Sequence, residues 1–384
     1  MIAFLYAFLI GGLAAAIGGG SSGSSPAPAA GPAEEDPPAS PPPLDEPEEE
    51  EPITPALPEE PSSGGGSGEG KPELPDSAYD IGWAGLSAEE QLIVELINRA
   101  RLDPQSEVER LDEPLASGIS SAPAEALAVV PTLSDAAEDH SEDMDNREFF
   151  SHTNPDGQGP GARALEAGHE NSFVGENIGW YGSTGAPDVQ TRAENHHQSL
   201  WESDGHQRNL MNDNWSEIGV GYDYGDHTID GFTYDHSTFV TEKFGDTGET
   251  YLTGVVIDDA DGDRFYDIGE GQGDVRITAW NDEGTHATAT WDAGGYSLAL
   301  PPGTYTVSFE GGDLDQPYET QVTIGDENVK LDVIEGDTGA VVASVSAATL
   351  PPQDDPASTL ISDAIALAEE TAVVEEETED LVLM

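Results

Sequence analysis

Six of the nine histidines in this sequence lie between His140 and Met211, and three of them, His140, His152 and His206, belong to short segments rich in carboxylates, asparagines and glycines. The segments are HSEDM (140–144), FFSHTNPDG (149–157), GENIG (175–179) and GHQRNLM (205–211). Two imidazoles and one or two carboxylates from separate segments form a ligand set that suits zinc with an open, water-filled position. A metal there would lower the pKa of its bound water, and a nearby Glu could take the proton, which is the minimum apparatus for hydrolysis.

The same polar groups also have a structural interpretation. Asn177 and Asn209 lie beside or near glycines and are expected to close turns, while Glu176 is expected to brace a helix end. Arg163 is then expected to pair with a cleft carboxylate. In this interpretation the groups form a buried polar network that fixes the fold. Both interpretations stay open on the sequence alone.

Other residues of this region are not assigned to a site. His196 and His197 are neighbours on a predicted helix and face different sides of it, so one of them is expected to be solvated. A cysteine hydrolase is excluded because the chain has no cysteine. Ser151 beside His152 lacks the nucleophile-elbow context of a serine hydrolase.

The first element predicted in the domain that carries these polar side chains is a capped helix. Ser87 and Glu90 form a capping box, apolar residues follow at helical spacing, and Pro104 ends the run, so a helix is predicted over 88–102. A second helix is predicted to start at Leu133, with His140 on its inward or cleft-facing side.

A third helix and two strands complete this region. The spacing of apolar residues predicts the helix near 187–201, and segments 217–224 and 237–245 alternate or run apolar like paired strands. Helices followed by strands predict an α+β domain over residues 80–248.

Net charge excludes several classes of partner. The chain has 77 acidic and 12 basic side chains and a formal net charge of −65, so nucleic acid and anionic lipid surfaces would be repelled. Such a surplus disfavours compact states and suggests a setting rich in salt or divalent cations. The absence of cysteine excludes disulfides and thiolate zinc sites.

The two ends of the chain have compositions unlike that of a folded core. Residues 1–20 are largely apolar and then glycine-rich, which predicts a signal peptide or membrane anchor, although the usual positive residues are missing. Residues 21–79 form an acidic linker rich in Pro, Gly and Ser, expected to be a disordered stalk. Residues 337–384 are interpreted as an acidic, poorly ordered tail.

Residues 249–336 contain short apolar segments separated by Gly, Asp and Pro signals, which predicts a small β-sandwich. Its segment DDADGDRFYDIGEG (258–271) places oxygen ligands at the spacing of a calcium loop. The predicted calcium ligands are Asp259, Asp261, Asp263, the carbonyl of Phe265, Asp267 and Glu270. Arg264 occupies the place where an EF-hand has Gly, and flanking helices are not evident, so a helix-loop-helix sensor is not predicted.

The segments of the first domain, together with INRAR (97–101), W…GHQRNL (201–210) and EIGVGY (217–222), resemble the bacterial branch of the CAP superfamily. This is the domain shared by cysteine-rich secretory proteins, antigen 5 and plant pathogenesis-related protein 1. The resemblance implies an α-β-α sandwich, an extracellular role, and a cleft with two His and two acidic residues that can hold a divalent metal, often zinc.

Carried over by position, the resemblance assigns His152, Glu176 and His206 to that cleft, as metal ligands or catalytic groups. The fourth position is either Asp204 or Glu202, because the segment before GHQRN is shorter than in eukaryotic members. His140 is a further candidate, since HSEDM is characteristic of bacterial relatives.

The calcium loop, with GGYSLALPPGTYTVSF (294–309) and the last strand, resembles the SdrD B-like and collagen-binding B-type repeats of bacterial surface proteins. The resemblance implies an immunoglobulin-like sandwich stiffened by Ca²⁺.

Together these observations predict a secreted or surface-tethered bacterial protein that binds an extracellular lipid, glycan or peptide through the first domain. The alternatives are a metal-dependent hydrolase of envelope polymers or peptides, and a structural surface adhesin.

Overall fold

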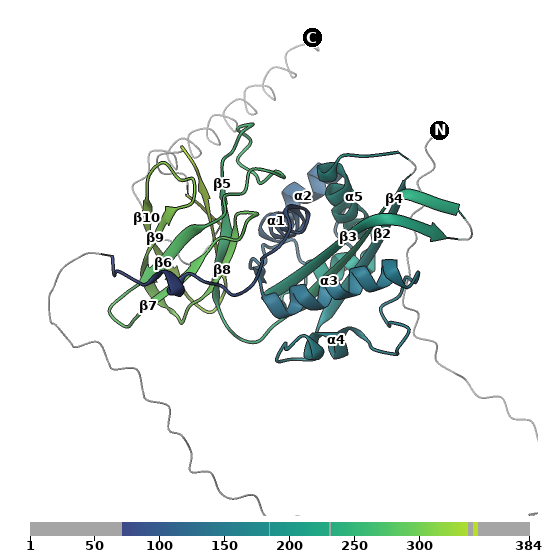
Figure 1. Ribbon diagram of the computed structural model, residues 1–384, viewed down its shortest axis with the longest axis horizontal. Helices are drawn as coiled ribbons and strands as arrows, with labels where there is room; N and C mark the ends of the chain where they lie inside the picture. The colour runs from purple at the N-terminus through teal and green to yellow at the C-terminus, as the bar shows by residue number, and fades with distance from the viewer. Residues whose placement is uncertain (1–70, 184, 230–231, 337–340, 345–384) are drawn as a thin grey trace, which may run out of the picture. The chain divides into compact units, whose positions relative to one another are not determined.

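The computed structural model describes residues 71–183, 185–229, 232–336 and 341–344, which belong to one compact unit. The predicted signal peptide or anchor at 1–20, most of the linker and most of the tail lie outside the described residues. The predicted α+β class is confirmed: the first domain contains both helices and strands, and the second contains strands (Figure 1).

The first domain is a four-stranded sheet with helices on both faces. Its strand order is β1-β3-β4-β2, with β1 parallel to β3 and the other pairs antiparallel. Figure 1 shows α3 and α4 on one side of this sheet and α1, α2 and α5 on the other. The helices are α1 (Ala88–Leu102), α2 (Pro104–Leu111), α3 (Pro131–Asn146), α4 (Pro160–Glu166), α5 (Val189–Trp201) and α6 (Asp204–Leu210). The strands are β1 (Ala128–Val129), β2 (Gly175–Ser183), β3 (Glu217–Ile229) and β4 (Phe232–Gly245).

Local sequence signals explain where the first two helices begin and end. Ser87 accepts a hydrogen bond from the Glu90 amide while Glu90 accepts one from the Ser87 amide, so the predicted capping box of α1 is confirmed. Pro104 ends α1 and also begins α2, because proline is tolerated at the first helical position and Asp103 caps the new helix. The helix α2 was not predicted.

Two glycines of the segment EIGVGY let α3 lie directly on the sheet. A Cβ atom on Gly219 would lie 2.1 Å from the backbone of Leu133, and one on Gly221 would lie 2.1 Å from the backbone of Glu138. Any larger residue at either position would therefore push α3 off β3. The close approach fixes the height of His140, which α3 carries, above the sheet.

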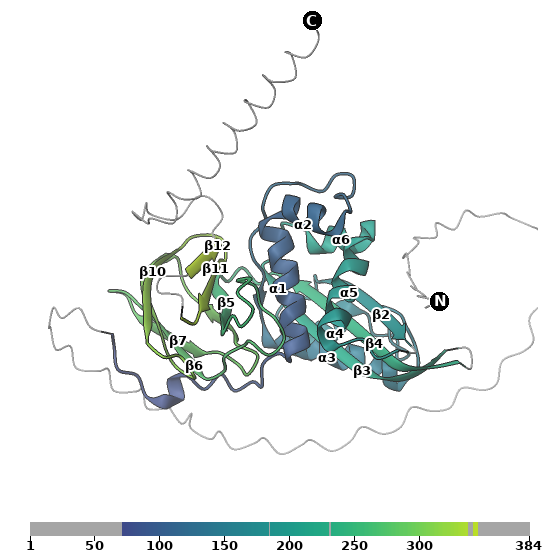
Figure 2. The same cartoon turned by 90° about the horizontal axis from the view of Figure 1, so that it is seen from above.

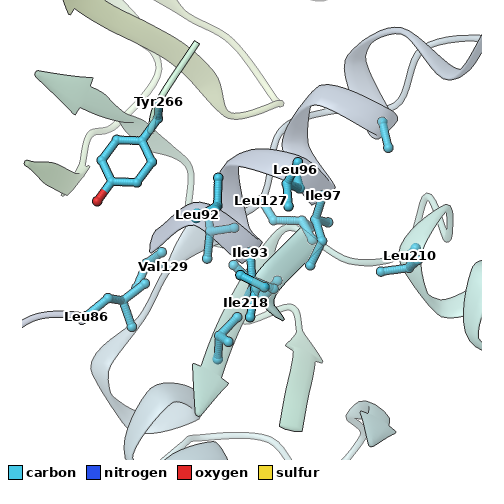
Figure 3. Packing of buried hydrophobic residues seen from close by; sticks show 14 of the residues in the cluster. Leu86, Leu92, Ile93, Leu96, Ile97, Leu127, Val129, Leu210, Ile218 and Tyr266 are labelled. Atoms are coloured by element: carbon cyan, nitrogen blue, oxygen red, sulfur yellow. The ribbon is translucent and has the colours of Figure 1, made fainter. Parts of the chain in front are cut away.

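The apolar core of the first domain lies between α1 and the other face of the sheet. It contains Leu92, Ile93, Leu96 and Ile97 of α1, which pack with residues of the strands and of α5 (Figure 3). Tyr266, which comes from the acidic loop of the second domain, is 1% exposed and belongs to the same cluster. The two domains therefore share a core.

The second domain consists of two four-stranded sheets whose side chains form a common core. The strand orders are β10-β9-β6-β7 and β12-β11-β5-β8. This architecture matches the predicted β-sandwich, and Figure 2 shows its strands from above. The strands are β5 (Tyr251–Ile257), β6 (Val275–Trp280), β7 (Thr285–Ala289), β8 (Gly295–Ala299), β9 (Gly303–Gly311), β10 (Tyr318–Ile324), β11 (Val329–Ile334) and β12 (Val341–Ser344).

Polar contacts also join α1 to the sandwich. The Trp291 indole donates to Gln91 over 2.9 Å, and the buried Lys330 ammonium lies 2.8 Å from the buried Glu95 carboxylate. Asp332 also contacts Lys330. A buried charge without a partner is energetically costly. The triad of Glu95, Lys330 and Asp332 therefore favours one orientation of the sandwich relative to α1.

Two segments predicted to lie outside the sandwich are part of it or contact it. Residues 71–79, predicted as linker, contact the sandwich, where the Tyr79 hydroxyl lies 2.8 Å from that of Thr278. Residues 341–344, predicted as tail, add strand β12 to the edge of β11. Both extensions gain backbone or side-chain hydrogen bonds that composition alone does not reveal.

Candidate functional site

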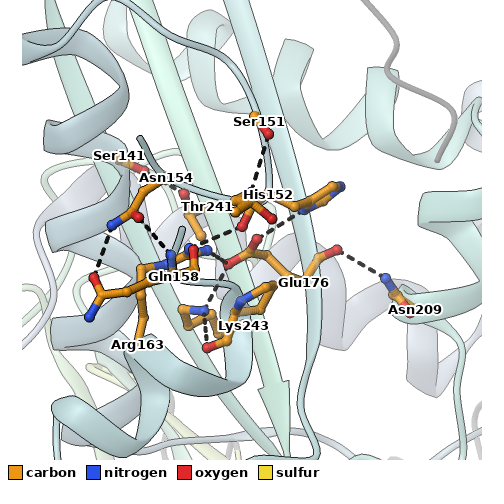
Figure 4. Close-up of polar contacts among 12 residues, drawn as sticks. Ser141, Ser151, His152, Asn154, Gln158, Arg163, Glu176, Asn209, Thr241 and Lys243 are labelled. Atoms are coloured by element: carbon orange, nitrogen blue, oxygen red, sulfur yellow. Dashed lines mark hydrogen bonds and ion pairs between the residues drawn. The ribbon is translucent and has the colours of Figure 1, made fainter. Parts of the chain in front are cut away.

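The centre of the candidate site is Glu176 on β2, the edge strand of the first sheet. Its neighbours across and around the strand come from three other places in the chain. In the β2–β4 pairing, Glu176 lies opposite Lys243, so both side chains share the face covered by α3 and α4. Arg163 comes from α4, and His152 from the loop between α3 and α4 (Figure 4).

Three side chains engage the Glu176 carboxylate. One oxygen lies 2.7 Å from both Arg163 Nη2 and Lys243 Nζ, and the other lies 2.9 Å from His152 Nδ1 (Figure 4). The Glu176 side chain is 1% exposed and that of Lys243 is 0% exposed. This confirms the expectation that Arg163 pairs with a cleft carboxylate.

Glu176 is ionised at neutral pH. Burial alone would raise the pKa of Glu176, but the hydrogen bond from His152 and the charges of Lys243 and Arg163 outweigh it and lower the pKa to about 2. An ionised carboxylate only accepts hydrogen bonds, so His152 Nδ1 carries a proton and donates it to Glu176 in a hydrogen bond. With its pKa near 2, Glu176 is a poor general base.

The loop that carries His152 is held by its own side chains and by Arg163. Asn154 Oδ1 accepts from the amides of Asp156 and Gln158, and Arg163 Nη1 donates to the carbonyls of His152 and Gln158. Arg163 therefore positions both the carboxylate and the loop. The His152 side chain remains 35% exposed, whereas Glu176 beside it is buried. We call the exposed edge of the cluster at His152 the His152 rim.

A second polar group lies around Asn177, the next residue of β2. Asn177 Nδ2 donates to Glu242 Oε2 over 2.9 Å, and Asn209 Nδ2 donates to Asn177 Oδ1 over 2.9 Å and to the Glu176 carbonyl over 3.2 Å. Glu242 is fully buried, and burial raises the pKa of its carboxyl to about 7. Asn177 and Glu176 thus lie on a strand, and the expectation that they close a turn and brace a helix end is wrong.

His206, on α6, lies near His152 at the edge of this group. Burial and the neighbouring His152 lower the pKa of His206 to about 4, so its imidazole is neutral at neutral pH. Its Nδ1 is buried and has no hydrogen-bond partner in the structure. The segments 149–157 and 205–211 both contact β2, through His152 with Glu176 and through the His206 carbonyl with Asn177.

The arrangement does not fit the zinc centre predicted from His152, Glu176 and His206. Among the residues that the structure describes, these three do not bring one ligand atom each within 4.8 Å of one another. The Glu176 oxygens face two cations and a histidine N–H, which leaves little affinity for a metal cation. Both candidates for the fourth ligand, Asp204 and Glu202, are exposed. Zinc binding itself stays a prediction.

His140 lies inside the protein on the same side of the sheet as Glu176. It is 0% exposed, and neither ring nitrogen has a hydrogen-bond partner among the residues that the structure describes. Burial lowers the pKa of His140 to about 4, and the charges of Arg163 and Lys243 contribute to this shift. The prediction that His140 points inward is confirmed.

His196 and His197 are both buried, so the expectation that one is solvated is wrong. His196 Nε2 lies 2.6 Å from the Thr238 hydroxyl on the sheet, and His197 Nε2 lies 2.9 Å from the Glu107 carboxylate on α2. The helix α5 packs against β2 on one side and against α1 on another, so the side chains of two adjacent residues are both buried. His196 therefore joins α5 to the sheet, and His197 joins α5 to α2; neither belongs to the cluster around Glu176.

The acidic loop between β5 and β6 brings its predicted ligands together. Two groupings can each place their carboxylate oxygens within 4.8 Å of one another. The groupings are Asp259 with Asp261 and Asp263, and Asp261 with Asp267 and Glu270. Arg264 has φ 66°, so it adopts the left-handed conformation that glycine provides at the sixth place of an EF-hand loop.

This loop also contacts the first domain. The Gln190 side chain on α5 contacts the Asp267 carboxylate and accepts a hydrogen bond from the Ile268 amide over 3.0 Å. The Arg99 guanidinium lies 4.5 Å from the centre of the Phe265 ring. The loop conformation is therefore supported from both domains.

Known proteins are similar to this chain in its first domain. Residues 94–244 match the family described as CAP, the Cysteine-rich secretory protein family. The chain is 30% identical over 138 residues to "Uncharacterized protein YkwD" of Bacillus subtilis (strain 168), a match that covers 36% of this chain and 43% of that protein.

Two solved structures are also similar. One is an extracellular protein containing a SCP domain from Bacillus anthracis str. Ames, with 26% identity, a TM-score of 0.26, and coverage of 41% of this chain and 39% of that one. The other is an outer surface protein from Borrelia burgdorferi, with 16% identity, a TM-score of 0.26, and coverage of 41% of this chain and 91% of that one. The chain thus spans less than half the length of both Bacillus proteins.

Within the described ranges, the helices are all too short or too polar to cross a membrane. The family match runs from within α1 to the end of β4 and so includes the elements that hold the cluster around Glu176. By this match residues 94–244 form a CAP domain, and YkwD of Bacillus subtilis is a bacterial relative.

Proposed function

We propose that this protein is a secreted or surface-tethered bacterial binding protein whose CAP domain recognises an extracellular lipid, glycan or peptide at the rim formed by His152. The observation that supports binding over metal-dependent hydrolysis is the engagement of Glu176 by Arg163, Lys243 and His152. A carboxylate held by two cations serves poorly as a metal ligand or as the base that activates water. An extracellular setting agrees with the description of the B. anthracis relative.

The charge of the cluster around Glu176 indicates which chemical class of ligand would bind. Arg163 and Lys243 carry two positive charges against one negative charge on Glu176, although the whole chain carries −65. A ligand with an acidic group therefore gains attraction at this rim that it finds at few other places on the protein. Acidic peptides and acidic glycans are favoured over neutral lipids.

The β-sandwich has a supporting role in this proposal. It is an SdrD B-like module in which Ca²⁺ is bound by Asp259, Asp261, Asp263, the Phe265 carbonyl, Asp267 and Glu270. The two groupings of carboxylates and the left-handed Arg264 support this assignment. Because the loop contacts α1 and α5, Ca²⁺ would stiffen the junction of the domains as well as the sandwich.

Binding is tested with the full chain and three probes: cell-wall glycan, an acidic peptide and phosphatidylcholine vesicles. We expect saturable binding to the glycan or the peptide, weakened by about tenfold or more in His152→Ala, because a rim side chain that contacts a ligand directly can contribute about 1.4 kcal/mol or more. His286→Ala, on strand β7 of the sandwich, is the control and should bind like the wild type. Cleavage of a probe that stops on adding a chelator would favour the hydrolase instead, and binding to none of the three would contradict the proposal.

A further inference from the structure

The interior between the sheet and the helices α3 and α4 carries an excess of positive charge. Lys243 is 0% exposed and Arg163 is 7% exposed, and the one carboxylate that contacts either of them is Glu176, within the described part of the chain. Burial of two cations with one anion leaves one positive charge without a counter-charge, although Lys243 Nζ also donates to the Pro160 carbonyl over 3.2 Å. An uncompensated buried charge costs several kcal/mol, so a neutralising group is expected nearby.

Hydrogen-bond donors at the same place also lack acceptors. Arg163 Nη1 donates to the loop carbonyls and Nη2 to Glu176, but Nε, which can only donate, is buried and has no acceptor in the described part of the chain. His140, fully buried on α3, has no partner on either nitrogen, and one of these must carry a proton. Buried donors in native proteins are nearly always satisfied, by protein or by a bound molecule.

The carboxylates on the rim do not supply the missing charge. Asp143 follows His140 by three residues on α3, but both of its oxygens contact Arg147, which also pairs with Asp156 over 2.6 Å. Glu166 on α4 accepts from Gln158 over 2.6 Å. These side chains belong to partly or fully exposed networks around the cluster, where water screens them.

We infer that a small monovalent anion of the halide class binds between Arg163 Nε and His140, beside Lys243. Such an anion neutralises the excess charge and accepts from the two unpartnered donors. A buried water would satisfy the donors but would leave the charge in place, so an anion fits both observations. A halide bound here would neutralise the same excess charge that favours an acidic ligand at the His152 rim, so the two anions would weaken each other's binding. The halide site also agrees with a saline setting, in which halide is abundant.

The test compares halide with non-halide salts for the full chain at constant ionic strength and pH 7.5. Sodium chloride or bromide should raise Tm by about 3–6 °C over sodium gluconate, as expected for an anion at roughly tenfold its Kd. Two variants should lose this halide-specific shift: His140→Leu removes a donor, and Lys243→Met removes the excess charge while keeping the Arg163–Glu176 pair. In crystals soaked in bromide, anomalous density should lie within reach of Arg163 Nε.

A matched control separates this effect from general stability. His196→Leu removes another buried histidine of the same domain, one whose Nε2 already has a partner in Thr238. This variant should be less stable but should keep the full halide shift. The inference is overturned if gluconate and chloride give the same Tm for the wild type, if water alone occupies the place, or if the shift persists unchanged in both His140→Leu and Lys243→Met.

Discussion

Replacing Glu176 with alanine is expected to lower the free energy of unfolding by about 3–5 kcal/mol, the cost of removing one partner from a buried ion cluster. The substitution leaves Arg163 and Lys243 buried without their carboxylate and frees the His152 loop from its anchor. For a domain of this size the loss corresponds to a decrease in Tm of roughly 6–20 °C. Thermal unfolding followed by circular dichroism measures it.

The effect of Glu176→Ala should depend on pH in a defined direction. The pKa of Glu176 in the folded protein is about 2, below its ordinary value of 4.5. Its contribution is therefore fully present above about pH 4.5 and is lost as the pH falls toward 2. The difference between wild type and variant should stay large from pH 5 to pH 8.

A double variant provides the control for this prediction. Glu176→Met combined with Lys243→Met removes one charge of each sign and should recover part of the stability lost in Glu176→Ala. A loss below about 1 kcal/mol in Glu176→Ala would mean that the cluster is well hydrated and contributes little, as exposed ion pairs do.

Removing Ca²⁺ is expected to lower the Tm of the protein, the second large effect that we predict. At about one hundred times its Kd, a ligand that binds only the folded state adds about 2.7 kcal/mol, which corresponds to roughly 5–10 °C in Tm. The gain is expected because Ca²⁺ would neutralise carboxylates that otherwise repel one another in the acidic loop. Differential scanning calorimetry with Ca²⁺ and with a chelator measures the shift.

The control for calcium uses two exposed aspartates. Asp261 belongs to both groupings of carboxylates, so Asp261→Ala should abolish the shift. Asp282 lies exposed in the turn between β6 and β7, and Asp282→Ala should retain the shift. Equal shifts in the two variants, or an equal effect of sodium chloride at matched ionic strength, would show that Ca²⁺ acts only as a general counterion.

Local signals predicted much of the secondary structure. The capping box predicted α1, and apolar spacing predicted α3, α5 and the paired strands β3 and β4 within a few residues. By contrast, β2 was missed because GENIGWYGS contains glycines and an asparagine, which disfavour strands in isolation. Pairing with β4 and cover by α5 override that preference.

The composition of the candidate site was only partly predictable. His152, Glu176 and Arg163 were identified in advance, but Lys243 was missed, although the strand pattern of STFVTEKFG places it on the opposite face from Glu242. The missing information is the register that sets Lys243 opposite Glu176, which depends on how β2 and β4 pair. Without it, the sequence suggested a metal where the structure places an ammonium group.

Elemental analysis of the purified full chain tests most directly whether protein cations, rather than a metal, neutralise Glu176. Zinc per chain is measured in the wild type, His152→Ala and His206→Ala after dialysis against a zinc-containing and then a zinc-free buffer. We predict the same small zinc content in all three proteins. One equivalent of zinc in the wild type that is lost in both variants would contradict this account.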